Sequence, residues 1–345
     1  MSARIQSVER HLAHVFHGKV EILAVESDLL RGNPLGDSNV RELICYTPQG
    51  VDESSPYNLY LPGFTSRPHA ALETHPWRRG LISEYDQRLA QRDPGPSMRL
   101  VLPDAFTRLG GSQYVNSKAV GPYASFIIDE VIPLATEHLG ASPYGVLGKS
   151  SGGFGALHLC MHHPGTFAAC GSISGDCGFD ALFPPEFLAC LRGLLAYDSD
   201  PKAFLESFFA EPDLGGDGHA VLNVLAMAAC YSPNPKAPLG FDLPMDLETG
   251  ELREDVWQRF LAFDPLVDCE RHVEALAGLD LLHIECGLRD EFHLQWGARR
   301  LSRKLAELRV AHSHEEHPGG HRGIDERALV CFDRFAQHRA HSKAN

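Results

Sequence analysis

The chain has 345 residues, of which 43% are apolar and 22% charged, so it can bury a core and is not a disordered protein. Its 45 acidic residues outnumber its 31 basic ones, and the formal net charge of −14 argues against nucleic acid as a partner. No apolar stretch reaches the roughly 18 residues of a membrane span, and the first 17 residues lack the apolar core of a signal peptide. Nine cysteines without a C-x-x-C pattern indicate reduced thiols, so we expect a cytoplasmic protein with no membrane partner.

Short β-like runs alternate with longer helical patterns along the chain, which predicts an α/β fold with a mostly parallel central sheet flanked by helices. The expected strands are 20–27, 42–47, 57–61, 98–102, 144–147, 167–172, 280–286 and 309–314. Apolar residues recur every three or four positions over 123–134 and 294–308, which predicts two amphipathic helices. Pro133 should kink or shorten the first helix, and Gly140 should cap its end.

The stretch 178–276 has a different pattern from the rest of the chain. It contains helical pieces at 187–195, 201–209 and 220–229, separated by Gly/Pro/Asp loops, and no clear strand pattern. We interpret it as a helical insertion, placed before the strand at 280–286, in a single domain that spans 1–345. Such an insertion serves as a lid or substrate wall, or else as a stabilising or dimer-forming element. The expected partners therefore include a second copy of the chain in a homodimer.

The run Gly148-Lys149-Ser150-Ser151-Gly152 matches G-x-S-x-G, and it lies between an expected strand and an Ala/Leu-rich helix. In such a strand–turn–helix the central serine projects above the sheet, and its flanking glycines let strand and helix approach closely. Ser150 is centred between the glycines and is the expected nucleophile, because a lysine does not fit the tight position. Ser151 would then supply a backbone N–H to the oxyanion hole.

A serine nucleophile needs a base and an acid that follow it in the chain. Asp290 comes just after the strand at 280–286, and His321 lies in the glycine-rich loop 318–321 that follows the last expected strand. We expect His321 to be the general base and Asp290 to orient it and to support its protonated form. Glu291 is the alternative acid.

Other residues compete for these roles. His312, His314 and His317 lie near the last strand, and together with Glu315 and Glu316 they suggest a metal site. Their spacing is not H-E-x-x-H, so a polar surface strand is the favoured interpretation and no metal is expected. Asp104 and Asp176 also follow expected strands, but the acid should follow the next-to-last strand, and these two lie on the wrong side of the chain order or belong to substrate loops.

A second oxyanion donor should come from the loop 61–66. Gly63 allows close backbone approach there, and the N–H of Phe64 or Thr65 is the candidate donor. An ordinary strand–helix loop is the alternative interpretation.

Three further residues are candidates for substrate binding, together with Gly63. Gln113 and Tyr114 end the glycine-containing loop 109–114, which suits a substrate wall. Lys149 stands beside the expected nucleophile and either contributes polarity to the acyl pocket or points to solvent.

These segments resemble the putative esterase family of α/β hydrolases, which includes esterase D, the enterochelin-esterase-like proteins and the antigen 85 mycolyltransferases. The resemblance rests on 32–37, 61–66, 102–104, 148–155, 287–292 and 319–321. It implies an α/β-hydrolase fold whose nucleophile, acid and base fall on Ser150, Asp290 and His321. Well-studied relatives usually carry His or Leu where Lys149 stands and Met where Ser151 stands, so no relative's substrate is carried over.

The sequence therefore predicts a serine hydrolase that cleaves carboxylic esters, or thioesters, of small molecules through an acyl-enzyme. No metal or organic cofactor is implied. An acyltransferase that uses the same acyl-enzyme is one alternative, and a non-catalytic binding protein on a hydrolase fold is the other.

Overall fold

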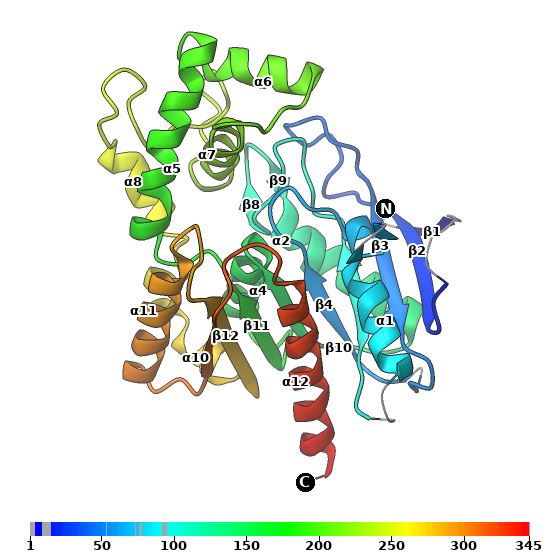
Figure 1. Ribbon diagram of the computed structural model, residues 1–345. Helices are drawn as coiled ribbons and strands as arrows, with labels where there is room; N and C mark the ends of the chain where they lie inside the picture. The colour runs from blue at the N-terminus through cyan, green and yellow to red at the C-terminus, as the bar shows by residue number, and fades with distance from the viewer. Residues whose placement is uncertain are drawn as a thin grey trace.

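A computed structural model of the chain describes residues 4–8, 15–52, 54–72, 74–75, 78–91 and 95–344 (Figure 1). Its main sheet has nine strands in the order β1-β2-β3-β7-β4-β10-β11-β12-β13. These strands are β1 (Arg4–Val8), β2 (Lys19–Glu26), β3 (Val40–Thr47), β4 (Tyr57–Leu61), β7 (Arg99–Pro103), β10 (Pro143–Lys149), β11 (Ala169–Ile173), β12 (Leu281–Gly287) and β13 (Ser313–His317). Two small ribbons pair β5 (Thr74–His75) with β6 (Arg78–Arg79) and β8 (Asn116–Ser117) with β9 (Gly121–Pro122).

Strands β7 to β13 of the main sheet pair in parallel, whereas β1, β2 and β3 form an antiparallel edge that joins β7. The parallel register sets Gly148 of β10 opposite Leu61 of β4, and Gly287 of β12 opposite His317 of β13. The carboxyl ends of these strands therefore meet at one edge of the sheet, which is where α/β folds form their sites.

Helices cover both faces of the sheet. The α-helices are α1 (Leu81–Gln91), α2 (Tyr123–Ser125), α3 (Ile132–Leu139), α4 (Ser151–His162), α5 (Phe179–Leu194), α6 (Pro201–Ala210), α7 (Gly218–Tyr231), α8 (Glu254–Leu261), α9 (Pro265–Asp268), α10 (Val273–Ala277), α11 (Leu294–Glu307) and α12 (Asp325–Ala344). A π-helix, η2 (Phe126–Val131), joins α2 to α3, and three 3-10 turns complete the set: η1 (Pro68–Ala71), η3 (Leu195–Tyr197) and η4 (Cys269–Arg271).

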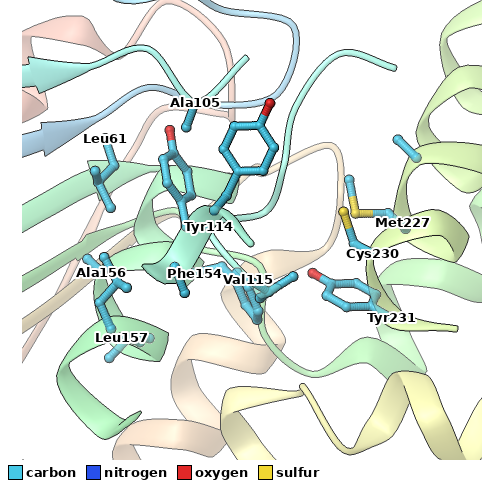
Figure 2. Packing of buried hydrophobic residues seen from close by; sticks show 14 of the residues in the cluster. Leu61, Ala105, Tyr114, Val115, Phe154, Ala156, Leu157, Met227, Cys230 and Tyr231 are labelled. Atoms are coloured by element: carbon cyan, nitrogen blue, oxygen red, sulfur yellow. The ribbon is translucent and has the colours of Figure 1, made fainter. Parts of the chain in front are cut away.

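Successive side chains of a strand point to opposite faces of the sheet, so the apolar core is divided between its two faces. Leu59, Val101 and Val146 belong to the larger cluster, which also holds most buried side chains of α4, α5 and α7. Their neighbours Tyr60, Leu100 and Leu147 belong to a second cluster, together with buried residues of α1 and α12. Figure 2 shows Met227, Cys230 and Tyr231 of α7 in the same cluster as Val115 and Phe154. The inserted helices thus share the core of the sheet.

Helices α5 to α10 follow β11 and precede β12, and α5 to α8 form a group at the upper left of Figure 1. In the sequence-based expectation the first of these helices starts at residue 187. The structure starts α5 at Phe179, with Pro184 and Pro185 inside it. They are the sixth and seventh residues of α5, beyond its first turn, so each removes an intrahelical N–H donor from the helix.

Two other expectations differ from the structure or are extended by it, and one helix is not expected from the sequence. The amphipathic stretch from 123 is one run of α2, η2 and α3, in which Pro133 occupies the first turn of α3, and Gly140 ends it at φ 62°. The last strand begins at Ser313 and not at 309, because Arg309 and Val310 bond back to α11 and complete its final turn. The sequence-based expectation does not include the long helix α12.

The nine cysteines are all buried and unpaired. Among the described residues, no helix combines the length and the apolar character needed to cross a membrane.

Candidate active site

Ser150 occupies a sharp turn between β10 and α4. Its backbone lies at φ 58° and ψ −126°, a strained conformation for a residue with a side chain. A Cβ on Gly148 would lie 2.5 Å from the main chain of Gly152, and a Cβ on Gly152 would lie 1.9 Å from the Leu61 carbonyl oxygen. Only glycine fits at these two positions, so the packing of strand, turn and helix requires the G-x-S-x-G pattern.

His321 lies between Ser150 and Asp290. Its Nε2 is 3.0 Å from Ser150 Oγ, and its Nδ1 is 2.8 Å from Asp290 Oδ2. Ser150 follows β10, Asp290 follows β12, and His321 follows β13, so the meeting of strand ends brings together residues 171 positions apart. All three residues that the sequence predicts for nucleophile, acid and base are in hydrogen-bond contact.

The loop that carries His321 is held by Glu291 and by glycines. Glu291 Oε2 accepts a hydrogen bond from the His321 main-chain N–H at 2.5 Å. A Cβ on Gly320 would lie 2.8 Å from the Glu291 carboxylate, and one on Gly287 would lie 2.5 Å from the Gly319 carbonyl oxygen. Glu291, the alternative acid, therefore contacts the backbone of His321 and not its ring.

Asp290 is almost fully buried, and its partners keep it charged. Burial by itself raises the pKa of a carboxyl group, but the His321 imidazole and the backbone N–H groups of Phe292 and Leu294 outweigh it and hold the pKa of Asp290 below its ordinary value. Phe292 N–H donates to Oδ1 at 3.0 Å, and the Cys286 thiol donates to Oδ2 at 3.7 Å. The carboxylate is thus ionised at neutral pH and oriented toward the imidazole.

Two main-chain segments border the nucleophile. Ser151 is the first residue of α4, so its N–H has no acceptor within the helix. Across from it, a Cβ on Gly63 would lie 3.3 Å from Ser150 Cβ, which brings the loop after β4 next to the nucleophile. In that loop the Thr65 N–H already donates to the Gly110 carbonyl oxygen at 2.8 Å. Of the two candidates for the second oxyanion donor, Phe64 and Thr65, this leaves the N–H of Phe64.

A cavity of about 610 Å³ opens over Ser150 and His321. Apolar side chains of the loop after β4, of α5 and of the acid loop form part of its wall: Phe64, Leu182, Phe183 and Phe292. Gly63 and Lys149, both candidates for substrate binding, line it as well. Three arginines, Arg67, Arg79 and Arg322, also border it, although Arg67 pairs with Asp104 at 2.8 Å and Arg79 with Glu84 at 3.5 Å.

Gln113 and Tyr114, the other two substrate-binding candidates, do not line this cavity. Both have positive φ, 53° and 55°, and both side chains turn into the interior. Tyr114 Oη donates to the Pro62 carbonyl oxygen at 2.5 Å, and Gln113 Nε2 donates to Asp176 Oδ2 at 3.1 Å. Tyr114 thus contacts the loop after β4 and Gln113 contacts Asp176, and neither side chain borders the cavity over Ser150.

Asp176 is a site residue that the sequence did not single out as functional. It follows β11, lines the cavity, and accepts hydrogen bonds from Gln113 and from Ser151 Oγ, the latter at 3.3 Å. Burial raises the pKa of Asp176 to about 6, in spite of these hydrogen bonds and of nearby His321. Its position at a strand end was the only sequence signal, and several aspartates share that signal.

Two of the three rival histidines have other partners. His312 Nε2 lies 2.8 Å from Ser302 Oγ, and His317 Nδ1 accepts the Gly319 N–H at 3.2 Å. His314 stands on β13 opposite Ile284 of β12.

The chain matches a known protein family. The model of the family described as Putative esterase matches residues 110–321, more than half of the chain. The chain belongs to the putative esterase family. This family member is a carboxylic-ester hydrolase, and its substrates are therefore small-molecule esters. The comparison with curated proteins finds no significant match.

Solved structures share the fold of this esterase. A ferulic acid esterase superposes with a TM-score of 0.55 at 16% identity, over 94% of this chain and 100% of its own. An S-formylglutathione hydrolase from Agrobacterium tumefaciens gives 0.54 at 16% identity, over 98% and 99%. A fluorophosphonate-binding serine hydrolase from Staphylococcus aureus gives 0.54 at 14% identity, over 92% and 98%. The α/β-hydrolase fold expected from the sequence is confirmed.

Proposed function

We propose that this esterase cleaves its substrate through an acyl-enzyme, with Ser150, His321 and Asp290 as the catalytic triad. The observation that carries the proposal is the continuous hydrogen-bonded chain from Ser150 Oγ through the two ring nitrogens of His321 to Asp290 Oδ2, at 3.0 and 2.8 Å. This is the arrangement that serine hydrolysis requires: a nucleophile, a base in contact with it, and an acid in contact with the base.

The three residues have distinct roles in the proposed reaction. Ser150 Oγ attacks the ester carbonyl carbon while His321 Nε2 takes the hydroxyl proton. The tetrahedral intermediate collapses, the bond to the leaving oxygen breaks, and His321 returns the proton to that oxygen. Water then attacks the acyl group on Ser150 with His321 again as base, which releases the acid and restores the serine. Asp290 keeps the imidazole in one orientation and stabilises its protonated form.

The proposed oxyanion hole consists of the N–H groups of Ser151 and Phe64. Ser151 begins α4, so the helix directs its unpaired N–H groups and its positive end toward the developing charge. Phe64 is chosen over Thr65 because the Thr65 N–H is used by Gly110. Each such donor is worth about 10²–10³ in rate.

The cavity indicates the class of ester that the site accepts. Its aromatic and aliphatic wall favours an acyl or alcohol group with an apolar part, and its volume leaves room for a group larger than acetyl. We propose carboxylic esters of this kind, with thioesters as the second class that the same acyl-enzyme would hydrolyse.

Hydrolysis of p-nitrophenyl esters of increasing acyl length, with Ser150→Ala and Ser151→Ala as a matched pair, tests the proposal. We expect Ser150→Ala to reduce hydrolysis to background and to lose labelling by a fluorophosphonate, because the nucleophilic oxygen is gone. Ser151→Ala keeps its backbone N–H and should remain active and labelled. Labelling that persists in Ser150→Ala, or that disappears only in Ser151→Ala, would overturn the assignment of the nucleophile.

A further inference from the structure

Two histidines on α4, the helix that begins after Ser150, face the end of the insertion, and neither lines the cavity. His158 and His162 are one turn apart on α4, and Asp268 ends α9 beside them. One ligand atom from each of these three residues lies within 4.8 Å of the other two. His162 Nε2 is 2.8 Å from Asp268 Oδ2, and the ring centroids of His158 and His162 are 4.3 Å apart.

A fourth residue, His272, lies next to this group. His272 follows Asp268 by four positions, and its Nε2 lies 3.5 Å from Asp268 Oδ1. Its ring centroid is 4.3 Å from that of His162. His158, His162 and Asp268 thus surround one point between α4 and α9, and His272 lies beside them on the Oδ1 side of the carboxylate.

His158 provides independent support for a ligand at this point. The residue is only 7% exposed, and its Nδ1 is buried without a hydrogen-bond partner among the described residues. Its ring stacks on Phe154 at 5.8 Å between centroids, which explains its burial but satisfies neither nitrogen. Because a buried polar atom without a partner is costly, this nitrogen is available to bind an ion or a water molecule.

The carboxylate is held in a suitable orientation. Arg271 donates to Asp268 Oδ1 through Nη2 at 2.5 Å and through Nε at 3.0 Å, which leaves Oδ2 directed at His162. Metal-ligating carboxylates in proteins are often hydrogen-bonded in this manner by a neighbouring group. The guanidinium also partly neutralises the carboxylate, so the imidazoles must supply most of the affinity.

We propose that His158, His162 and Asp268 form a structural site for Zn²⁺ or a similar divalent transition metal, with the adjacent His272 as the candidate fourth ligand. The donor set of imidazole nitrogens and one carboxylate suits Zn²⁺, Co²⁺ or Ni²⁺, whereas Mg²⁺ and Ca²⁺ prefer oxygen ligands alone. His158 lies eight positions after Ser150 on the same helix, about 12 Å along its axis, so the metal takes no part in ester cleavage. Its effect is to fasten the end of the insertion to the helix that begins at the nucleophile.

Metal binding to the full chain, freed of metal by dialysis against a chelator, tests this site. We expect one Co²⁺ per chain with the visible absorption of a nitrogen and oxygen site and without thiolate charge-transfer bands, which separates it from binding to cysteines. Zn²⁺ should compete for the site and raise the melting temperature in proportion to the logarithm of its concentration. His162→Gln and Asp268→Asn should each weaken Zn²⁺ binding by about 100-fold or more and abolish the increase in melting temperature that Zn²⁺ causes.

His163→Gln is the matched control, because His163 is the next residue at the same helix end and lies outside the cluster. It should bind Co²⁺ and Zn²⁺ as the wild type does. The His162 side chain is 37% exposed and that of His272 24%, so glutamine at either position is compatible with folding, and His272→Gln serves as a second variant. If His162→Gln and His163→Gln bind metal equally, or if Zn²⁺ leaves the melting temperature of the wild type unchanged, the cluster is an ion pair around Asp268 only and the proposal is wrong.

Discussion

Asp290 and Glu291 are neighbours in the chain and hold different parts of the same histidine. Asp290 Oδ2 contacts the His321 ring at Nδ1, while Glu291 Oε2 accepts the His321 main-chain N–H. Only the first contact can stabilise a charge that develops on the imidazole during the reaction. The second fixes the loop that carries it.

Asp290→Asn and Glu291→Gln should therefore differ in activity. The asparagine amide cannot support the protonated imidazole and favours the wrong tautomer, so kcat should fall by about 10³–10⁴. In Glu291→Gln the new side-chain amide still offers an oxygen to the His321 N–H, and kcat should stay within about tenfold of the wild type. Steady-state hydrolysis of a p-nitrophenyl ester measures both. A larger loss in Glu291→Gln than in Asp290→Asn would assign the acid to Glu291.

The buried carboxyl of Asp176 predicts a pH dependence of stability. Its pKa is raised by burial from 3.8 to about 6, so the folded chain binds this proton more tightly than the unfolded chain does. The stability that this group contributes is therefore highest below about pH 4, falls as the pH rises to about 6, and stays reduced above it. A shift of about two pKa units corresponds to about 2–3 kcal/mol.

Asp176→Asn removes this contribution, because the amide does not titrate. The difference in free energy of unfolding, wild type minus variant, can be measured by urea denaturation. It should fall by about 2–3 kcal/mol between pH 4 and pH 7.5. A difference that is constant over this range, or that grows with pH, would contradict the raised pKa.

Gly152 allows the contact between α4 and β4, and its replacement should be costly. A Cβ there would meet the Leu61 carbonyl oxygen at 1.9 Å, a backbone atom that has no room to move. Gly152→Ala should lower the free energy of unfolding by at least about 3 kcal/mol. Gly278→Ala is the control, since its Cβ would meet its nearest atoms at 3.4 and 3.6 Å and its φ is −77°. The control should change stability by less than about 1 kcal/mol in urea unfolding, and equal effects of the two variants would refute the close approach.

The loop that carries Phe64 is supported by Gly110, which lies at φ +101°. A Cβ on Gly110 would be 2.8 Å from the Phe64 ring, so alanine there should displace the proposed oxyanion donor. We expect Gly110→Ala to lower kcat by about 10²-fold or more with a smaller change in KM, because this donor acts mainly in the transition state. Fluorophosphonate labelling and the melting temperature separate a misplaced loop from an unfolded chain. Unchanged kcat would exclude the loop after β4 as the source of the second donor.

Much of the fold is predictable because local sequence carries it. The central strands are continuous apolar runs that turn signals bound, and β4 has the bounds that its sequence predicts. The G-x-S-x-G pattern is informative because its glycines are required by contacts within one strand–turn–helix unit. The helix α12 is missed, and the starts of α5 and β13 are misplaced. The start of α5 depends on a helix that continues through two prolines, and the start of β13 depends on how α11 ends.

The sequence by itself determined the fold class, the family and the chain order of a candidate nucleophile, acid and base, because each of these is recorded in short segments of residues. Tertiary structure alone decided which partners those residues have. It joined the Thr65 N–H to Gly110, turned Gln113 and Tyr114 into the interior, and buried Asp176 beside Ser151. It also brought His158 to Asp268, 110 positions further along the chain. Such contacts depend on packing between distant elements, and no local pattern of residues encodes them.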